Sequence, residues 1–178
     1  MTRRDTVNAL EEMWSIYVDS FPGEERRDID SQRKILRNPL YHLHLLRHHN
    51  EVIGLVALWD VKQFVFVEHL AIKKTMRGHG YGSLTLERLT AKYPHVVLEV
   101  EPPTTQTARR RIRFYQKRGF HLNPYKYDQP PYVAGQASVP LLLMTFPQPV
   151  DARRFHLIQK TLRSVVYGTS QGNGHRFN

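Results

Sequence analysis

A glycine-rich turn is the segment of this sequence best suited to bind a ligand. Residues 77–82 read Arg-Gly-His-Gly-Tyr-Gly and lie between a strand-like run, 64–72, and a helix-like run, 83–93. Glycine removes the side chains that keep a ligand away from the backbone, and the free amides of a helix's first turn favour an anion. Arg77 adds a planar guanidinium that matches phosphate oxygens. The segment therefore predicts a phosphate or pyrophosphate site.

Two familiar phosphate loops fit this turn poorly. A nucleotide P-loop has Lys and then Ser or Thr after its last glycine, whereas Gly82 is followed by Ser83 and Leu84. A dinucleotide fingerprint has the spacing G-x-G-x-x-G and an acidic residue about 20 positions later, and neither is present. Glycines also end strands and cap helices for structural reasons alone, so a purely structural turn remains the alternative.

Metal and thiol chemistry have little support in this sequence. There are ten histidines and no cysteine, which excludes disulfides, thiolate ligands and a cysteine nucleophile. His42 and His44 have a spacing that could chelate from a strand, but no partner carboxylate is evident. We interpret these histidines as surface or structural residues and expect no metal.

Hydrophobic periodicity predicts the elements that must position the turn. Strands are expected over 41–47, 51–60, 64–72, 95–101 and 140–146, with a loop or broken strand over 125–132. Helices are expected over 8–20, 28–36, 83–93, 107–117 and 151–166, with Gly119 and Asp151 as caps. The first three strands should form an antiparallel meander, and the strand–helix–strand unit 64–101 requires parallel neighbours. This is an α+β fold with a mixed, mostly antiparallel sheet and helices on both faces.

Length and charge limit the function further. At 178 residues the chain is most simply one domain, expected over 1–167, with a disordered tail over 168–178. No apolar run is long enough to span a membrane and no signal core follows the charged start, so a cytoplasmic protein is expected. Residues 101–178 carry 12 basic and 3 acidic side chains, and so hold most of the chain's net charge of +10. Their basic helices predict a solvated or cofactor-facing surface, with nucleic acid as the disfavoured alternative.

Three motifs in register resemble the GNAT family of acetyl-CoA-dependent N-acetyltransferases. Arg77-x-x-Gly80-x-Gly82 matches the family's pyrophosphate signature, and Glu68 to Ile72 resembles the strand before it. The end of the next helix, Phe114-Tyr115-x-x-Arg118-Gly119-Phe120, resembles the segment that closes the cofactor site. Two further motifs, "FP-x-x-ER" from Phe21 and "QPPY" from Gln129, are similar to a bacterial branch of the family. The family usually begins with a strand before its first helix, but too few residues precede the first helix of this chain for that strand to form fully.

The resemblance implies roles for particular residues. Acetyl-CoA would pair its pantetheine with the strand end and place its pyrophosphate on the turn; the residues implied are Leu70, Ala71, Ile72, Arg77, Gly78, His79, Gly80, Tyr81, Gly82 and Ser83. Tyr115 would protonate the departing thiolate, with simple packing against Phe114 and Phe120 as the alternative. Glu68 is the first candidate for general base, since burial would raise its pKa; Glu99, Glu101 or a water relay are the alternatives. His69 should face away from Glu68 if the strand is regular.

The acceptor is expected to be a small-molecule or peptide amine. Acid clustering at Glu24, Glu25 and Asp28 gives the hypothesis that these residues attract a cationic amine. The sequence therefore predicts an N-acetyltransferase that acts by direct attack of a primary amine in a ternary complex. Two alternatives stay open, a basic nucleic-acid-binding module and a catalytically silent acyl-CoA binder. A homodimer is also left open.

Overall fold

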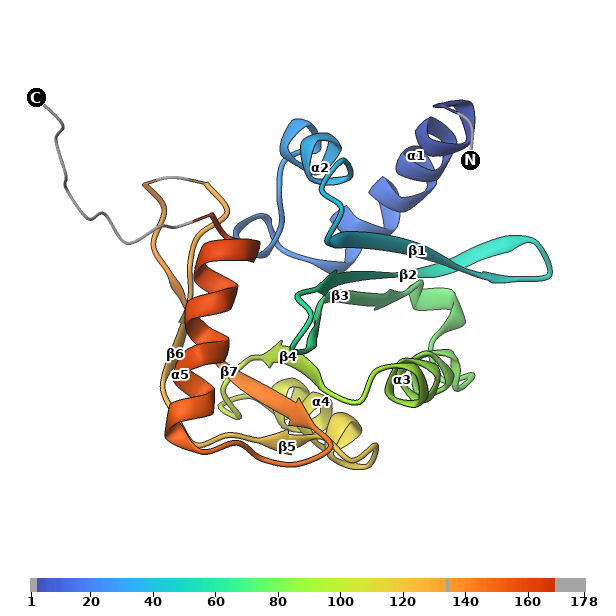
Figure 1. Ribbon diagram of the computed structural model, residues 1–178. Coiled ribbons are helices and arrows are strands. Elements are labelled where there is room, and N and C mark those ends of the chain that lie inside the picture. The colour runs from blue at the N-terminus through green and yellow to red at the C-terminus, as the bar shows by residue number, and fades with distance from the viewer. Residues whose placement is uncertain (1–2, 134, 169–178) are drawn as a thin grey trace, which may run out of the picture.

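A mixed sheet of seven strands forms the centre of the molecule (Figure 1). The computed structural model describes residues 3–133 and 135–168, without the side chains of residues 3–10 and 24. The strand order is β1-β2-β3-β4-β7-β5, and β6 pairs with β7. The strands are β1 Tyr41–His48, β2 Glu51–Asp60, β3 Val65–Ile72, β4 Val96–Val100, β5 His121–Leu122, β6 Tyr127–Gln129 and β7 Val139–Phe146. The predicted antiparallel meander and the parallel pairing of β3 with β4 are both confirmed.

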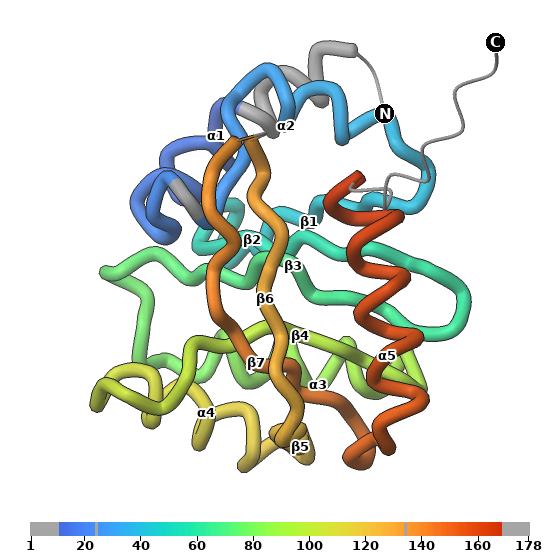
Figure 2. Tube along the Cα trace, turned by 90° about the vertical axis from the view of Figure 1, so that its left-hand side faces the viewer, coloured from blue at the N-terminus to red at the C-terminus, as the bar shows by residue number. Residues whose placement is uncertain are grey.

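Helices cover both faces of this sheet, as predicted. They are α1 Arg3–Ser20, α2 Ile29–Ile35, α3 Tyr81–Lys92, α4 Gln106–Gln116 and α5 Ala152–Thr161, which continues into a π-helical turn, Leu162–Val166. Alternation along β2 divides the core, because Leu58 packs with Leu86 of α3 and Ile112 of α4, whereas Trp59 packs with Phe155 of α5. The helix α1 shares the face of α5, and Figure 2 shows α1 and α2 across β1–β3 from α3 and α4.

Local capping explains where several helices begin and end. Thr105 begins α4 by accepting a hydrogen bond from the Ala108 amide at 3.0 Å, and Gly119 follows the helix at φ +80°. Asp151 begins α5 by accepting from the Arg154 amide at 2.7 Å. The predicted cap at Asp151 is thus confirmed, whereas the C-cap of α4 is Lys117 and Gly119 lies two residues beyond it in the turn that ends the helix.

Some elements differ from the sequence prediction. The described chain starts in α1 at Arg3, so no strand precedes that helix within the described residues. The strand β5 was not predicted, because two residues are too few to show an alternating pattern. The segment 125–132, expected as a loop or broken strand, contains the three-residue strand β6. The predicted disordered tail lies almost wholly outside the described residues.

Two irregularities of β3 create the space for a site. Its parallel pairing with β4 covers only Val65–Val67, so the second half of β3 has no described partner on that side. Against β2, Val67 pairs with Leu58 and His69 with Ala57, which leaves Glu68 as the extra residue of a β-bulge. Strands β3 and β4 therefore stop pairing directly before Glu68, where the bulge changes the direction of the β3 side chains.

Candidate active site

A cleft of about 620 Å³ opens where β3 and β4 stop pairing. Its walls are the end of β3, the end of β4, the start of α3 with the glycine turn before it, and one side of α4. Further wall residues come from the end of α1 and from β6. The fold thus brings the predicted phosphate turn and the predicted catalytic residues to one continuous space.

The glycine turn has the geometry of an anion cradle. Gly78 and Gly80 have φ angles of +85° and +82°, which only glycine adopts without strain. A Cβ atom built on either residue would meet no described atom within 4 Å, so the space above the turn is open. Gly80 is also the N-cap of α3, and the first amides of that helix have no intrahelical acceptor. This arrangement fits a pyrophosphate group.

Most of the residues predicted for the cofactor line the cleft. Of the ten, only His79 is not part of the described wall, because its ring folds back onto its own turn, with Nδ1 3.1 Å from the Arg77 carbonyl oxygen. Arg77 donates from Nε to the Ile72 carbonyl oxygen at 3.0 Å, which fixes the start of the guanidinium beside the turn.

Arg118 is a wall residue that the sequence analysis did not assign to the site. Its guanidinium lies 3.8 Å from the Phe114 ring centroid and donates to the Phe114 carbonyl oxygen at 2.5 Å and to the Ser83 hydroxyl. It therefore ties the end of α4 to the first turn of α3, where it adds a positive charge to the phosphate cradle. Its position three residues after Tyr115 does not reveal this contact.

The end of β3 presents an unpaired backbone edge to the cleft. Leu70, Ala71 and Ile72 all line it, and none of them pairs with β4. An extended ligand chain can add to such an edge through main-chain hydrogen bonds. The edge is therefore suited to the pantetheine arm of CoA.

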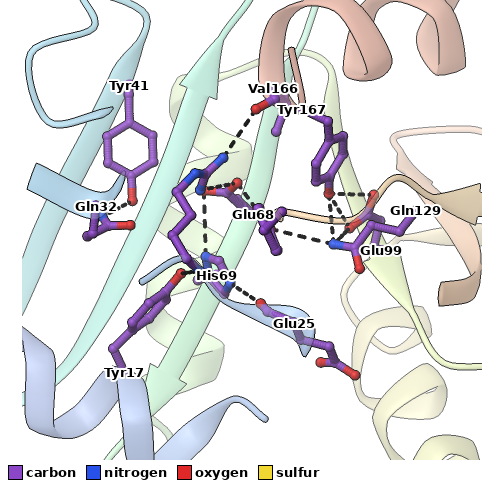
Figure 3. A network of polar contacts seen from close by, with 12 residues as sticks. Tyr17, Glu25, Gln32, Tyr41, Glu68, His69, Glu99, Gln129, Val166 and Tyr167 are labelled. Atoms are coloured by element: carbon purple, nitrogen blue, oxygen red, sulfur yellow. Dashed lines mark hydrogen bonds and ion pairs between the residues drawn. The ribbon is translucent and has the colours of Figure 1, made fainter. Parts of the chain in front are cut away.

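The pKa of Glu68 is shifted in the direction opposite to the prediction, because of the residues around its side chain (Figure 3). Its side chain is 0% exposed and accepts hydrogen bonds from Arg27 Nη1 at 2.7 Å and from the Tyr132 hydroxyl at 3.1 Å. Burial is the largest single influence and would raise the pKa of Glu68, but Arg27 and His69 together outweigh it and lower the pKa to about 2. The prediction of a raised pKa was wrong, because the buried cation could not be read from the sequence.

His69 also departs from its predicted orientation. The bulge at Glu68 interrupts the alternation of β3, so both side chains lie on the face of α1 and α5. The Nδ1 atom of His69 is 3.6 Å from Oε2 of Glu68, and Nε2 is 3.0 Å from the Glu25 carbonyl oxygen. His69 therefore connects β3 to the loop between α1 and α2 and does not face away from Glu68.

Glu99 of β4 is the cleft carboxylate with a raised pKa. It accepts hydrogen bonds from the Tyr167 hydroxyl at 2.9 Å, from Gln129 Nε2 at 3.1 Å and from the Tyr127 hydroxyl. All three donors are neutral, so burial, helped by the charge of Glu68, raises the pKa of Glu99 to about 8. The residue is only partly buried and lines the cleft.

Tyr115 lies on the α4 wall, packed between two aromatic rings. Its ring centroid is 5.2 Å from that of Phe114 and 5.8 Å from that of Phe120, both in edge-to-face geometry. Burial raises the pKa of its phenol, so the hydroxyl stays protonated at neutral pH. Within the described part of the chain, this hydroxyl has no hydrogen-bond partner, which leaves it available to a ligand. The structure thus shows both the packing and an available donor.

Of the acidic residues predicted to attract the acceptor, Glu24, Glu25 and Asp28, only some belong to the described site. Glu25 lines the cleft, whereas Asp28 caps α2 by accepting from the Ser31 amide at 2.8 Å. The side chain of Glu24 lies outside the described part. Glu101, the other candidate base, pairs with Arg111 at 2.8 Å on the exposed rim.

Several residues around the two carboxylates were missed by sequence reasoning. They come from a loop, a short strand and the end of the last helix, so no fixed spacing relates them to the catalytic strands; they are Arg27, Tyr127, Gln129, Tyr132 and Tyr167. Only the "QPPY" motif at 129–132 gave a signal for the region.

Three broader expectations concern the basic helix, a membrane span and a metal site. Arg110 and Arg111 of the basic helix line the cleft, in agreement with the cofactor-facing interpretation. Among the described helices, none is long and apolar enough to cross a membrane. The described residues contain no group of three or more side chains able to hold a metal ion.

Comparison with known proteins identifies the family pattern over most of this chain. The model of the acetyltransferase (GNAT) family matches residues 9–120. A GNAT-family protein of Bacteroides thetaiotaomicron, named as an acetyltransferase, is 36% identical in sequence, and its structure superposes with a TM-score of 0.87. That superposition covers 96% of this chain and 97% of the other.

More distant relatives agree with this assignment. A Bacillus subtilis (strain 168) protein, YjbC, which is named as an acetyltransferase, is 35% identical over 105 residues, or 56% of this chain. That stretch covers 52% of YjbC, so the chain spans about half the length of this curated relative. A Bacillus subtilis acetyltransferase solved in complex with CoA is 15% identical, with a TM-score of 0.54 over 76% of this chain and 90% of the other. It therefore shares the fold alone.

Proposed function

This chain belongs to the acetyltransferase (GNAT) family, and we propose that it transfers an acetyl group from acetyl-CoA to a primary amine. The amine attacks directly in a ternary complex, within a single domain over residues 1–167. The observation that carries the proposal is the shared cleft: it joins an open phosphate cradle, an unpaired strand edge and a carboxylate of raised pKa.

The cofactor residues divide into two groups along this cleft. The turn from Arg77 to Ser83, with Arg118 beside it, holds the pyrophosphate through backbone amides and positive charge. The edge at Leu70–Ile72 holds the pantetheine arm, and its amides can polarise the acetyl carbonyl. When bound, acetyl-CoA supplies an activated thioester, and no metal is required for its transfer to an amine.

Glu99 acts as the general base. An alkyl ammonium ion has a pKa of about 10.4 and must lose a proton before its nitrogen can attack. A glutamate at its usual value of 4.5 would be a weak acceptor for that proton, whereas Glu99 has a pKa of about 8. The shift makes the proton transfer roughly 5 kcal/mol easier. Glu68 lines the same cleft but is paired with Arg27, and its pKa of about 2 makes it a weak proton acceptor, so it does not take this role.

Tyr115 acts as the proton donor to the departing sulfur. Its raised pKa keeps the phenol neutral, and Tyr115 lines the same cleft as Glu99. A positioned phenol can supply a hydrogen bond or a proton to a thiolate as the bond to the acetyl carbon breaks.

Calorimetric titration with acetyl-CoA is the first test of this function. We expect micromolar binding to the wild-type chain and its loss in Gly80→Glu, whose carboxylate would occupy the open space of the cradle. Gly80→Ala is the matched control, because it imposes the same strain at φ +82° without charge or length.

The two variants separate backbone strain from blockage of the cradle. If Gly80→Ala weakens binding as much as Gly80→Glu, the turn is sensitive to strain and carries no evidence of a phosphate. If a folded Gly80→Glu binds acetyl-CoA like the wild type, the cradle is not the cofactor site. After binding is established, release of free thiol with primary amines measures the transfer itself.

A further inference from the structure

The cleft carries opposite charges at its two ends. Arg77 and Arg118 stand beside the glycine turn, and Arg110 lies on the adjoining wall of α4. At the other end the lining carboxylates are Glu25, Glu68 and Glu99, whereas Glu101 on the rim is paired with Arg111. This second end receives the acceptor if the first holds the pyrophosphate.

The donors at the carboxylate end are already directed at carboxylates. The Tyr167 hydroxyl and the Gln129 amide point to Glu99 (Figure 3), and the Tyr127 hydroxyl also donates to it. Arg27, which is 6% exposed, donates to Glu68 at 2.7 Å and to the Val166 carbonyl oxygen at 3.2 Å. These groups hold the site together and are not available to an incoming anion.

Hydrogen-bond acceptors, in contrast, are left over at this end. The Oε1 atom of Gln129 and the Oε2 atom of Glu68 are buried and have no hydrogen-bond partner in the described part of the structure. Gln129 is 4% exposed and belongs to the cleft wall. Buried acceptors are nearly always paired with a donor, from a ligand or from water. The end therefore calls for a donor-rich, positively charged group.

We propose that the acceptor is a cationic amine whose reacting nitrogen has no carboxylate on the adjacent carbon, an inference that depends on the proposed acetyl transfer. Within the described cleft wall, every arginine belongs to the glycine turn, to α4 or to the residues directly after α4. A carboxylate beside the nitrogen would thus lie near Glu25, Glu68 and Glu99, where the buried cation Arg27 is already paired with Glu68. Like charges in such positions cost several kcal/mol.

Three amines of similar size test this selectivity. Norleucine carries a carboxylate next to its amine, norleucinamide has the same branched skeleton without the charge, and 1-aminopentane lacks the group altogether. We expect kcat/KM for norleucinamide and 1-aminopentane to exceed that for norleucine by about 100-fold or more. Because norleucinamide keeps the branching, the comparison isolates charge from shape.

A charge reversal at the mouth of the cleft sharpens the test. Glu25→Lys should reduce the preference for norleucinamide over norleucine by about tenfold, since it places a cation where the carboxylate would lie. Glu12→Lys is the control, because Glu12 is exposed and pairs with Arg47 on α1 and β1, away from the cleft. Acetyl-CoA affinity should remain unchanged in both variants.

The outcomes distinguish the two proposals. Equal kcat/KM for norleucine and norleucinamide overturns the acceptor class while leaving acetyl transfer intact. The acceptor class is also overturned if acetyl-CoA binds but neither norleucinamide nor 1-aminopentane is acetylated. Absence of acetyl-CoA binding in a folded sample contradicts the proposed function instead.

Discussion

Glu68 and Glu99 show how the same residue type acquires opposite properties on neighbouring strands. Both lie at the point where β3 and β4 stop pairing and both face the α5 side of the sheet. Glu68 is paired with a buried guanidinium, and its pKa falls to about 2. Glu99 is surrounded by neutral donors, and its pKa rises to about 8. The partners Arg27 and His69 therefore make Glu68 a structural anion, whereas neutral donors leave Glu99 a proton acceptor.

The region around Glu68 should contribute mainly to stability, whereas the region around Glu99 should contribute mainly to catalysis. The Arg27–Glu68 pair joins the loop after α1, strand β3 and the end of the π-helical turn, so its removal should affect folding. The group around Glu99 lies against the cleft and should affect turnover. Substitutions in each region can break this division or make it sharper.

The largest effect is expected when Arg27 is removed. Arg27→Met leaves the carboxylate of Glu68 buried without its partner, which should lower the free energy of unfolding by about 3–5 kcal/mol. Denaturant-induced unfolding measures this loss. Arg26→Met is the matched control, because the neighbouring cation only lies over the Trp14 ring at 5.9 Å and should cost about 1 kcal/mol or less.

A second variant shows whether the loss comes from the stranded charge. In Arg27→Met with Glu68→Gln, both charges are gone, and most of the stability should return. If the double variant is as unstable as Arg27→Met alone, packing of the Arg27 side chain explains the effect and the ion pair does not.

Glu99→Gln should have the next largest effect, on turnover. The amide keeps the size of the side chain but cannot accept the ammonium proton, so kcat/KM should fall by about 100-fold or more. In the wild type, kcat/KM should rise with pH as Glu99 ionises and level off above about pH 8. The variant should lack this ionisation.

Glu68→Gln provides the contrast for that measurement. In samples that remain folded, its pH profile should keep the rise near pH 8, because Glu68 is ionised throughout this range. Loss of the rise in Glu68→Gln and its persistence in Glu99→Gln would reverse the assignment of the base.

Tyr115→Phe should reduce turnover less than Glu99→Gln does. The ring and its contacts with Phe114 and Phe120 remain, so only the proton donor is lost. We expect kcat to fall by about 30-fold to 100-fold, while calorimetric affinity for acetyl-CoA is unchanged. Equal kcat in wild type and variant would limit Tyr115 to packing.

The sequence predicted the local parts of this molecule better than the parts assembled from distant segments. The turn at 77–82 and the pairing order of the first strands follow from spacing and periodicity. The base assignment went to Glu68 because its partner, Arg27, lies 41 positions earlier and reaches it only through the fold. Tyr167 approaches Glu99 from 68 positions later. Neither contact leaves a periodic signal, and the bulge at Glu68 has none either.

The two carboxylates should also give stability opposite dependences on pH. A lowered pKa stabilises the fold above the unfolded value of about 4.5, and this contribution is lost as pH falls from about 4.5 towards 2 through Glu68. A raised pKa stabilises the fold below about 4.5, and this contribution is lost as pH rises from about 4.5 to 8 through Glu99. Glu99→Gln should flatten the second slope, by at most about 1.4 kcal/mol per pH unit. An unchanged slope would show that Glu99 has an ordinary pKa.

The smallest expected effect comes from Tyr167→Phe. The Tyr167 hydroxyl is 3.0 Å from one oxygen of Glu99 and 2.9 Å from the other, and it donates to the ionised carboxylate. Its removal should therefore raise the pKa of Glu99 further and move the rise in kcat/KM to higher pH by about 0.5–1 unit. Tyr125→Phe is the control, since that ring packs on Phe155 of α5.

This small shift decides how the region around Glu99 is balanced. If the rise moves to higher pH, the neutral donors partly offset burial and hold the pKa of Glu99 within reach of physiological pH. If it moves to lower pH, water that takes the place of the missing hydroxyl stabilises the ionised carboxylate better than the hydroxyl did. Either shift keeps Glu99 as the titrating group, whereas an unmoved profile in Tyr167→Phe would mean that another group controls the rate. The contrast between Glu68 and Glu99 would then be supported by their hydrogen-bond partners and burial, and not by the kinetics.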